Sequence, residues 1–92
     1  MTASITARLR VHDFDAWKAM FDEDAPRARE KALGWTLYRG TDEQNEVFIR
    51  VDFASVADAT EARDRVLSSG VLERLPDHYG PIVIQQAESR TP

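Results

Sequence analysis

SITARLRVH, residues Ser4–His12, is the segment from which the fold can be inferred. Its polar side chains alternate with apolar ones, which are Ile5, Ala7, Leu9 and Val11. A period of two puts the apolar side chains on one face, so the segment is predicted to be a half-buried strand. The elements that follow must therefore cover this apolar face.

The next segment has the spacing of a helix. Its apolar side chains recur at three and four residues, and they are Phe14, Trp17, Phe21, Ala25, Ala28 and Ala32. Asp13 is placed to cap the first turn, and Gly34 is placed to end the helix. Pro26 donates no amide hydrogen and crowds the carbonyl near Asp22, so we expect a break near Asp24, with Pro26 opening a second helical piece.

The remaining elements follow from the same two periods and from turn residues between them. In chain order they are a strand over 34–40, a polar connection over 41–45, a strand over 46–53, a helix capped by Ser55 and ended by Gly70, a helical turn over 71–75, a loop over 76–81 and a strand over 82–86. The predicted helix has Val56, Ala59, Ala62 and Val66 as its apolar side. Residues 87–92 are expected to be a frayed tail of a single domain that spans 1–92.

This order, β-α-β-β-α-β, predicts an α+β fold of the ferredoxin-like type. Right-handed crossovers place both helices on one face of a four-stranded antiparallel sheet. The opposite face is too apolar for water and too charged for a core, so we expect it to meet a partner. The side chains assigned to it are Arg8, Arg10, Thr36, Tyr38, Phe48, Arg50, Asp52, Val83 and Gln85.

Composition excludes several classes of function. The 92 residues contain no cysteine, so disulfide scaffolds, iron–sulfur clusters and thiolate zinc sites are excluded. A net charge of −4 argues against binding to nucleic acid. No apolar run reaches the roughly 20 residues of a membrane span, and no leader is recognisable, so a cytoplasmic location is the expectation.

Four segments together resemble a known family. They are Val11–Asp22, Gly34–Arg39, Asn45–Val47 and Leu67–Leu72. On these segments the chain is similar to the dimeric α+β barrel superfamily, in particular its antibiotic-biosynthesis monooxygenase-like domains, over about 5–86. The resemblance implies a homodimer whose two sheets face each other. Members of the family carry out cofactor-free oxidation of aromatic polyketides, cyclisation, isomerisation or heme degradation, so the fold does not settle the reaction.

The chain departs from two branches of this family. In the heme-degrading branch, a tryptophan on the second helix and a histidine after it are essential, and Val66 and Pro76 stand at those positions here. The polyketide monooxygenases carry aromatic and amide side chains on or beside that helix, whereas 55–69 holds no aromatic residue, Asn or Gln. These differences argue against heme degradation and weaken the oxygenase interpretation.

Two histidines are candidate catalytic bases. His12 stands where the first strand meets the first helix, a position that borders the cleft between sheet and helices, and its pKa suits removal of a phenolic or enolic proton. Alternatively, it only ends a polar strand face. His78 lies between Asp77 and Tyr79, which supply an orienting carboxylate and a donor. The alternative, which the rarity of adjacent residues pointing the same way favours, is a solvated loop.

Aromatic side chains are candidates for a ligand pocket. Trp17, Phe21 and Trp35 are assigned to a substrate pocket, with core packing as the alternative for the first two. Tyr38 and Tyr79 are candidates to assist a catalytic histidine, while Tyr38 and Phe48 also fit a dimer contact. The dimer face is assigned to Arg8, Arg10, Phe48, Arg50, Asp52 and Val83.

Two functional hypotheses follow from these residues and from the resemblance. The first is a cofactor-independent monooxygenase or cyclase that acts on an aromatic or polyketide-like metabolite and uses His12 as base. The second is a non-catalytic dimeric domain that binds a small ligand or has a structural role. Neither the two histidines nor the carboxylates have the spacing of a metal site, so neither metal nor cofactor is expected.

Overall fold

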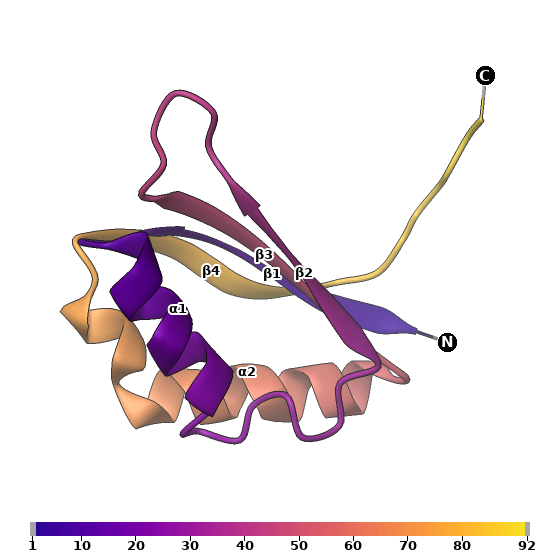
Figure 1. The fold of residues 1–92 in the computed structure, drawn as a ribbon. Helices are drawn as coiled ribbons and strands as arrows, with labels where there is room; N and C mark the ends of the chain where they lie inside the picture. Colours follow the sequence, from indigo (N-terminus) through magenta and orange to yellow (C-terminus); the bar gives the residue numbers. More distant parts are fainter. Residues whose placement is uncertain (1, 92) are drawn as a thin grey trace.

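A computed structural model describes residues 2–91 of the chain. Its elements, in chain order, are β1 (Ala3–Arg10), α1 (Phe14–Glu23), β2 (Gly34–Arg39), β3 (Glu46–Phe53), α2 (Val56–Ser69), the short 3₁₀ helix η1 (Val71–Arg74) and β4 (Asp77–Ile84). This order confirms the predicted β-α-β-β-α-β arrangement (Figure 1).

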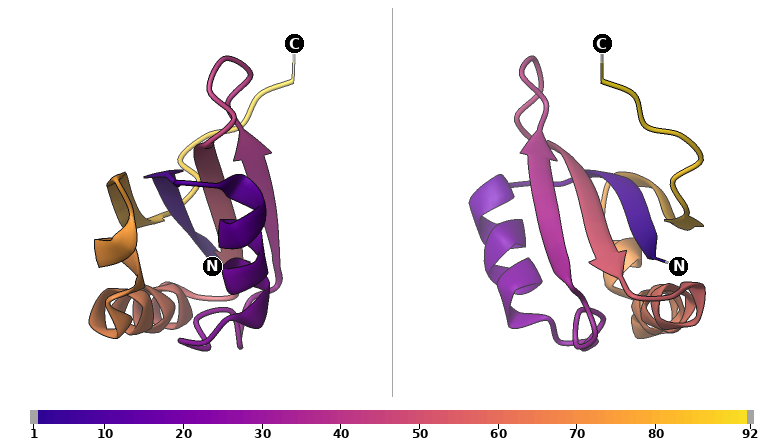
Figure 2. Two further views of the ribbon diagram at one scale, coloured as in Figure 1. Left: turned by 60° about the vertical axis from the view of Figure 1, so that its left-hand side comes forward. Right: turned by 90° about the vertical axis from the view of Figure 1, so that its right-hand side faces the viewer.

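The four strands form one antiparallel sheet in the order β2-β3-β1-β4. Strands β1 and β3 occupy its centre, where Ile5 lies opposite Val51 and Ala7 opposite Ile49. Because the alternating apolar positions of the two strands are in register, they form one continuous apolar face. Both helices cover that face, and the other face is left open (Figures 1 and 2).

The core consists of two clusters on this covered face. One, beside α2, contains Ala3, Ile5, Val51, Phe53, Ala59 and Ala62. The other, beside α1, contains Ala7, Leu9, Val11, Trp17 and Val47. Ala59 and Ala62 are buried as predicted, because small side chains let α2 approach the sheet, whereas Val56 is 43% exposed and does not belong to the core.

The first helix begins and breaks where the sequence predicted. The Asp13 carboxylate accepts a hydrogen bond from the Ala16 amide, and the helix ends at Asp24, which has a φ of 47°. The second helical piece predicted from Pro26 is wrong: turns follow instead, and Gly34 begins β2. The cause is Asp24, whose carboxylate caps the amides of Ala28 and Arg29 in place of helical carbonyls.

The predicted loop over 76–81 is also wrong, because Asp77–Pro81 belongs to β4. Tyr79 lies opposite Arg8 and Ile82 opposite Thr6, so β4 has one extra residue between these two pairs, which is a β-bulge. Gly80 occupies the bulge with a φ of 84°, and a Cβ there would lie 2.8 Å from the Thr6 carbonyl oxygen.

The bulge changes which side chains of β4 face the helices. Beyond it Val83 pairs with Ile5 and packs on the core cluster beside α2. Its assignment to the open dimer face is therefore corrected, and Ile82 and Ile84 take that place. Gln85 follows the end of β4 and is exposed.

Residues 85–91 have no regular secondary structure and extend away from the sheet (Figures 1 and 2), so the last strand ends two residues before the predicted bound at Gln86 and the tail predicted over 87–92 begins earlier. Pro92, the last residue of that tail, lies outside the described residues. Within residues 2–91, no helix has the length and apolar character needed to span a membrane.

Candidate functional site

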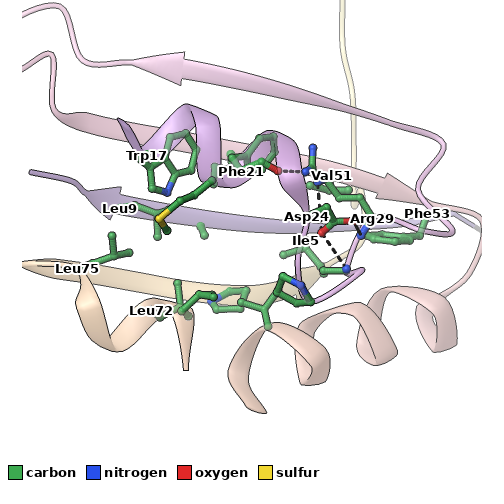
Figure 3. Close-up of a pocket in the computed structure, with 18 residues that line it drawn as sticks. Ile5, Leu9, Trp17, Phe21, Asp24, Arg29, Val51, Phe53, Leu72 and Leu75 are labelled. Atoms are coloured by element: carbon green, nitrogen blue, oxygen red, sulfur yellow. Dashed lines mark hydrogen bonds and ion pairs between the residues drawn. The ribbon is translucent and has the colours of Figure 1, made fainter. Parts of the chain in front are cut away.

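A cavity of about 150 Å³ lies between the sheet and the helices (Figure 3). Its floor is the covered face of β1 and β3, and its walls come from α1, η1, the end of α2 and the connection between α1 and β2. Nearly all of its lining side chains are apolar, among them Ile5, Leu9, Trp17, Phe21, Val51, Phe53, Val66, Leu72 and Leu75. Such a lining suits an apolar ligand.

Two stacked aromatic rings from α1 form one wall. Trp17 and Phe21 are four residues apart, so they share a helix face, and their ring centroids are 5.1 Å apart. Both line the cavity as predicted from the sequence. Trp35 meets the edge of Phe21 at 6.3 Å but is 49% exposed and does not line the cavity.

The charged side chains that line the cavity are Asp24 and Arg29. The Arg29 Nε lies 3.8 Å from the Asp24 Oδ1, and the Arg29 Nη2 donates to the carbonyl oxygen of Phe21. The guanidinium lies between two rings, with its carbon 3.7 Å from the centroid of Phe21 and 4.6 Å from that of Trp35. The Arg29 side chain is only 9% exposed.

Sequence reasoning missed this ion pair. Asp24 lies at the predicted break and Arg29 in the predicted second helical piece, and no local spacing indicates a contact between side chains on two such pieces. The break at Pro26 is the signal that could have found them, because a connection that leaves a helix beside a cleft tends to carry functional side chains.

Neither predicted catalytic histidine lines the cavity. His12 is exposed, and its backbone carbonyl accepts a hydrogen bond from the Asn45 side chain at 3.4 Å. His78 is exposed on β4, with its Nδ1 2.9 Å from the Gly80 carbonyl oxygen. Neither side chain therefore contacts the cavity in this structure.

The two tyrosines lie on the other side of the sheet. Tyr38 on β2 pairs with Phe48, and Tyr79 on β4 pairs with Arg8, which puts both rings on the open face. Because β2 and β4 are the opposite edges of the sheet, the two rings are separated by β3 and β1. The four predicted catalytic residues are not brought together.

The open face combines exposed apolar side chains with ion pairs. Tyr38, Phe48, Tyr79 and Ile84 are between 39% and 65% exposed. Arg8 pairs with Asp77 at 3.1 Å, and Arg10 pairs with Glu46 at 3.4 Å. Arg50 pairs with Asp52 at 3.2 Å within β3. Among residues 2–91, no group of three or more potential metal ligands is found.

A network of ion pairs joins α2 to the connection that carries Asp24 and Arg29. Arg65 on α2 contacts Glu30 at 2.9 Å and Glu61 at 2.7 Å, and it donates to the Arg27 carbonyl. Lys31 contacts Glu61 at 3.1 Å. Hydrogen bonds from Arg65 lower the pKa of Glu30, and those from Lys31 lower the pKa of Glu61.

Comparison with solved structures identifies proteins of the same fold. SnoaB, a cofactor-independent oxygenase from Streptomyces nogalater, has a TM-score of 0.74 and 15% identity, with 96% of this chain and 95% of that chain covered. Rv0793 from Mycobacterium tuberculosis has a TM-score of 0.65 and 17% identity, with 99% and 100% covered.

A third protein, from Chloroflexus aurantiacus and described as a candidate antibiotic biosynthesis monooxygenase, has a TM-score of 0.61 and 13% identity, with 99% and 98% covered. No family model matches the chain, and no curated protein matches its sequence. The likeness confirms the predicted ferredoxin-like fold for this chain.

Proposed function

We propose that this chain, which has the fold of a cofactor-independent oxygenase, is a single domain that binds a small aromatic metabolite between its sheet and its helices. The observation that carries this proposal is the apolar cavity with the stacked rings of Trp17 and Phe21 in its wall. A ligand ring that binds there moves from water into contact with an apolar surface and packs against aromatic rings. Both the removal of apolar surface from water and the contact between rings favour binding.

The proposed binding unit is a homodimer in the cytosol. The open face exposes Tyr38, Phe48, Tyr79 and Ile84 together, which is an unusual surface for a monomer. Both signs of charge surround these side chains, so a second copy rotated by a two-fold axis can place acidic groups against basic ones. Burial of this face in the dimer adds to the stability of a small protomer.

An oxygenase or cyclase that acts on the bound ligand is the second candidate function. It is favoured by the apolar cavity, because exclusion of water protects a reactive carbanion while it meets dioxygen. In such an oxidation a substrate CH₂ group and O₂ give C=O and H₂O. Simple binding ranks first because Asp24 is engaged by two backbone amides and by Arg29, which leaves no free carboxylate in the cavity wall to take the proton.

A pair of variants on α2 tests the binding site. Val66 lines the cavity and Val56 is exposed on the same helix, so Val66→Phe fills the site whereas Val56→Phe does not. In titrations with acetophenone followed by two-dimensional NMR, we expect the wild type and Val56→Phe to show shifts at cavity residues, and Val66→Phe to lose them. Shifts confined to the open face, or unaffected by Val66→Phe, contradict the proposed site.

The same samples separate binding from turnover. An oxygen electrode, with benzoylacetone as a single-ring substrate that carries an acidic CH₂ group and with chelator present, measures uptake above the rate of autoxidation. Uptake that Val66→Phe abolishes identifies an oxygenase. Ligand recovered unchanged, without oxygen uptake and without a cyclised product, identifies a binding domain.

A further inference from the structure

We infer that the cavity selects a single-ring aromatic compound carrying an uncharged acceptor oxygen, and that Arg29 recognises this oxygen. The inference rests on the proposed function and adds the class of ligand. It combines the size of the cavity, the free hydrogen-bonding capacity of Arg29 and the neutralisation of Asp24, which are independent observations.

Size limits the ligand to one ring. The cavity encloses about 150 Å³. An apolar cavity of about this volume in another protein holds benzene, whereas sites for drug-sized ligands span about 300–1,000 Å³. A polycyclic ligand that lay wholly within this volume would have to displace Trp17 or Phe53, which are 9% and 1% exposed and packed in the two core clusters. Single-ring compounds fit without this displacement.

Arg29 supplies the donor. A guanidinium has five N–H groups in a planar fork. In Arg29, Nε faces Asp24 and Nη2 donates to Phe21, while Nη1 has no hydrogen-bond partner within residues 2–91. Because the group is held between the rings of Phe21 and Trp35, it cannot turn toward solvent without losing both contacts. No buried side-chain nitrogen within residues 2–91 lacks a hydrogen-bond partner, so Nη1 is accessible to solvent, and an acceptor oxygen on the ligand would take the place of water at this donor.

The Asp24 carboxylate favours a ligand without a net charge. Its Oδ1 accepts from the Ala28 amide and its Oδ2 from the Arg29 amide, each at 3.0 Å, so the carboxylate is held in place beside the guanidinium. The pair is neutral as a whole. A carboxylate ligand would be repelled by Asp24, and an ammonium ligand would compete with Arg29, so a ketone or aldehyde oxygen is the favoured partner.

Four probes test size and polarity separately. Acetophenone and isopropylbenzene have almost the same shape, but only the first carries an acceptor oxygen. 2-Acetylnaphthalene and 2-acetylanthracene keep the oxygen and add rings. In titrations followed by NMR, we expect acetophenone to bind about tenfold more tightly than isopropylbenzene, and both larger ketones to bind more weakly than acetophenone.

Two variants assign the discrimination to Arg29. Arg29→Met removes the hydrogen-bond donors and keeps a long apolar side chain. We expect the affinity of this variant for acetophenone to fall to its affinity for isopropylbenzene, and the affinity for isopropylbenzene to change little. Arg65→Met, an arginine outside the cavity, should keep the preference. Thermal melting of both variants confirms folding, and the comparison of probes on the wild type needs no variant.

The outcomes distinguish the two proposals. Equal affinities for acetophenone and isopropylbenzene in the wild type overturn the role of Arg29 and leave the binding site in place. Tighter binding of the two larger ketones overturns the single-ring limit. Absence of binding by all four probes contradicts the proposed function itself.

Discussion

Phe53 and Val47 are the largest side chains that the fold encloses completely, with 1% and 0% exposed. Both point from β3 to the covered face, Phe53 to the cluster beside α2 and Val47 to the cluster beside α1. Because a protein interior is close-packed, each contributes through its contacts as well as through the surface it removes from water.

Truncation of Phe53 should therefore be costly. We expect Phe53→Ala to lower the free energy of unfolding by about 3–5 kcal/mol, because it removes a ring and enlarges a cavity that already exists. Denaturant unfolding followed by circular dichroism measures the loss. Val56→Ala, at an exposed position on α2, should change the free energy by less than about 0.5 kcal/mol. Equal effects of the two substitutions would contradict this description of the core.

Substitution of His12 tests the catalytic role that the sequence predicted for this residue. It is exposed and does not line the cavity, so His12→Ala should leave the affinity for acetophenone unchanged. Trp17→Leu, which replaces a ring in the cavity wall, should weaken binding about tenfold. NMR titration of both variants gives the two affinities. A loss of binding in His12→Ala would restore His12 to the site.

Among the elements, β4 depends on a glycine at its bulge. Gly80→Ala adds a methyl group 2.8 Å from the Thr6 carbonyl oxygen at a φ of 84°, so it should destabilise the fold by more than about 1 kcal/mol. Gly34→Ala is the control, because a Cβ there meets nothing within 4 Å. Thermal unfolding of both variants tests this. Comparable stabilities would show that the bulge does not require glycine.

The ion pairs between α2 and the connection after α1 predict a pH dependence. The pKa values of Glu30 and Glu61 are lowered below 4.5 by Arg65 and Lys31, so unfolded chains bind more protons than folded ones in acid. The resulting stabilisation is present above pH 4.5 and is lost as the pH falls through the lowered pKa values. The pKa of Lys31 is raised above 10.5 by Glu61, so its contribution persists up to that pH.

Arg65→Gln isolates this contribution. We expect the wild type to melt at a higher temperature than the variant at about pH 7, and the difference to shrink at a second pH well below 4.5, as Glu30 and Glu61 take up protons. Raised salt at neutral pH should also reduce it, because these groups are exposed and screened by salt. A difference in melting temperature that is the same at both pH values would contradict the assignment to these carboxylates.

For the whole molecule, the open face of the sheet predicts the assembly. Phe48 lies at its centre on β3 and is 39% exposed. In the proposed dimer it is buried, so Phe48→Asp should give monomers in sedimentation velocity at micromolar concentration, where the wild type sediments as a dimer. Leu67→Asp, which adds the same charge to an exposed position on α2, should remain dimeric. A wild-type monomer would refute the homodimer.

The sequence determined the topology because the relevant forces are local. Alternation in β1 and β3, the helical spacing of α1 and the caps at Asp13 and Ser55 depend on neighbours a few residues away. Element order and the covered face of the sheet follow from them. The same patterns placed Trp17 and Phe21 on the inner side of α1, which is why they were identified as pocket residues.

The tertiary structure decided everything that depends on pairing between distant segments. The bulge at Gly80 arises only when β4 meets β1, and it turned Val83 inward and extended the strand through the predicted loop. Asp24 and Arg29 meet because the chain turns after α1, and neither His12, which follows the end of β1, nor His78 on β4 lines the cavity. These features rest on the relative placement of side chains, which no local period encodes.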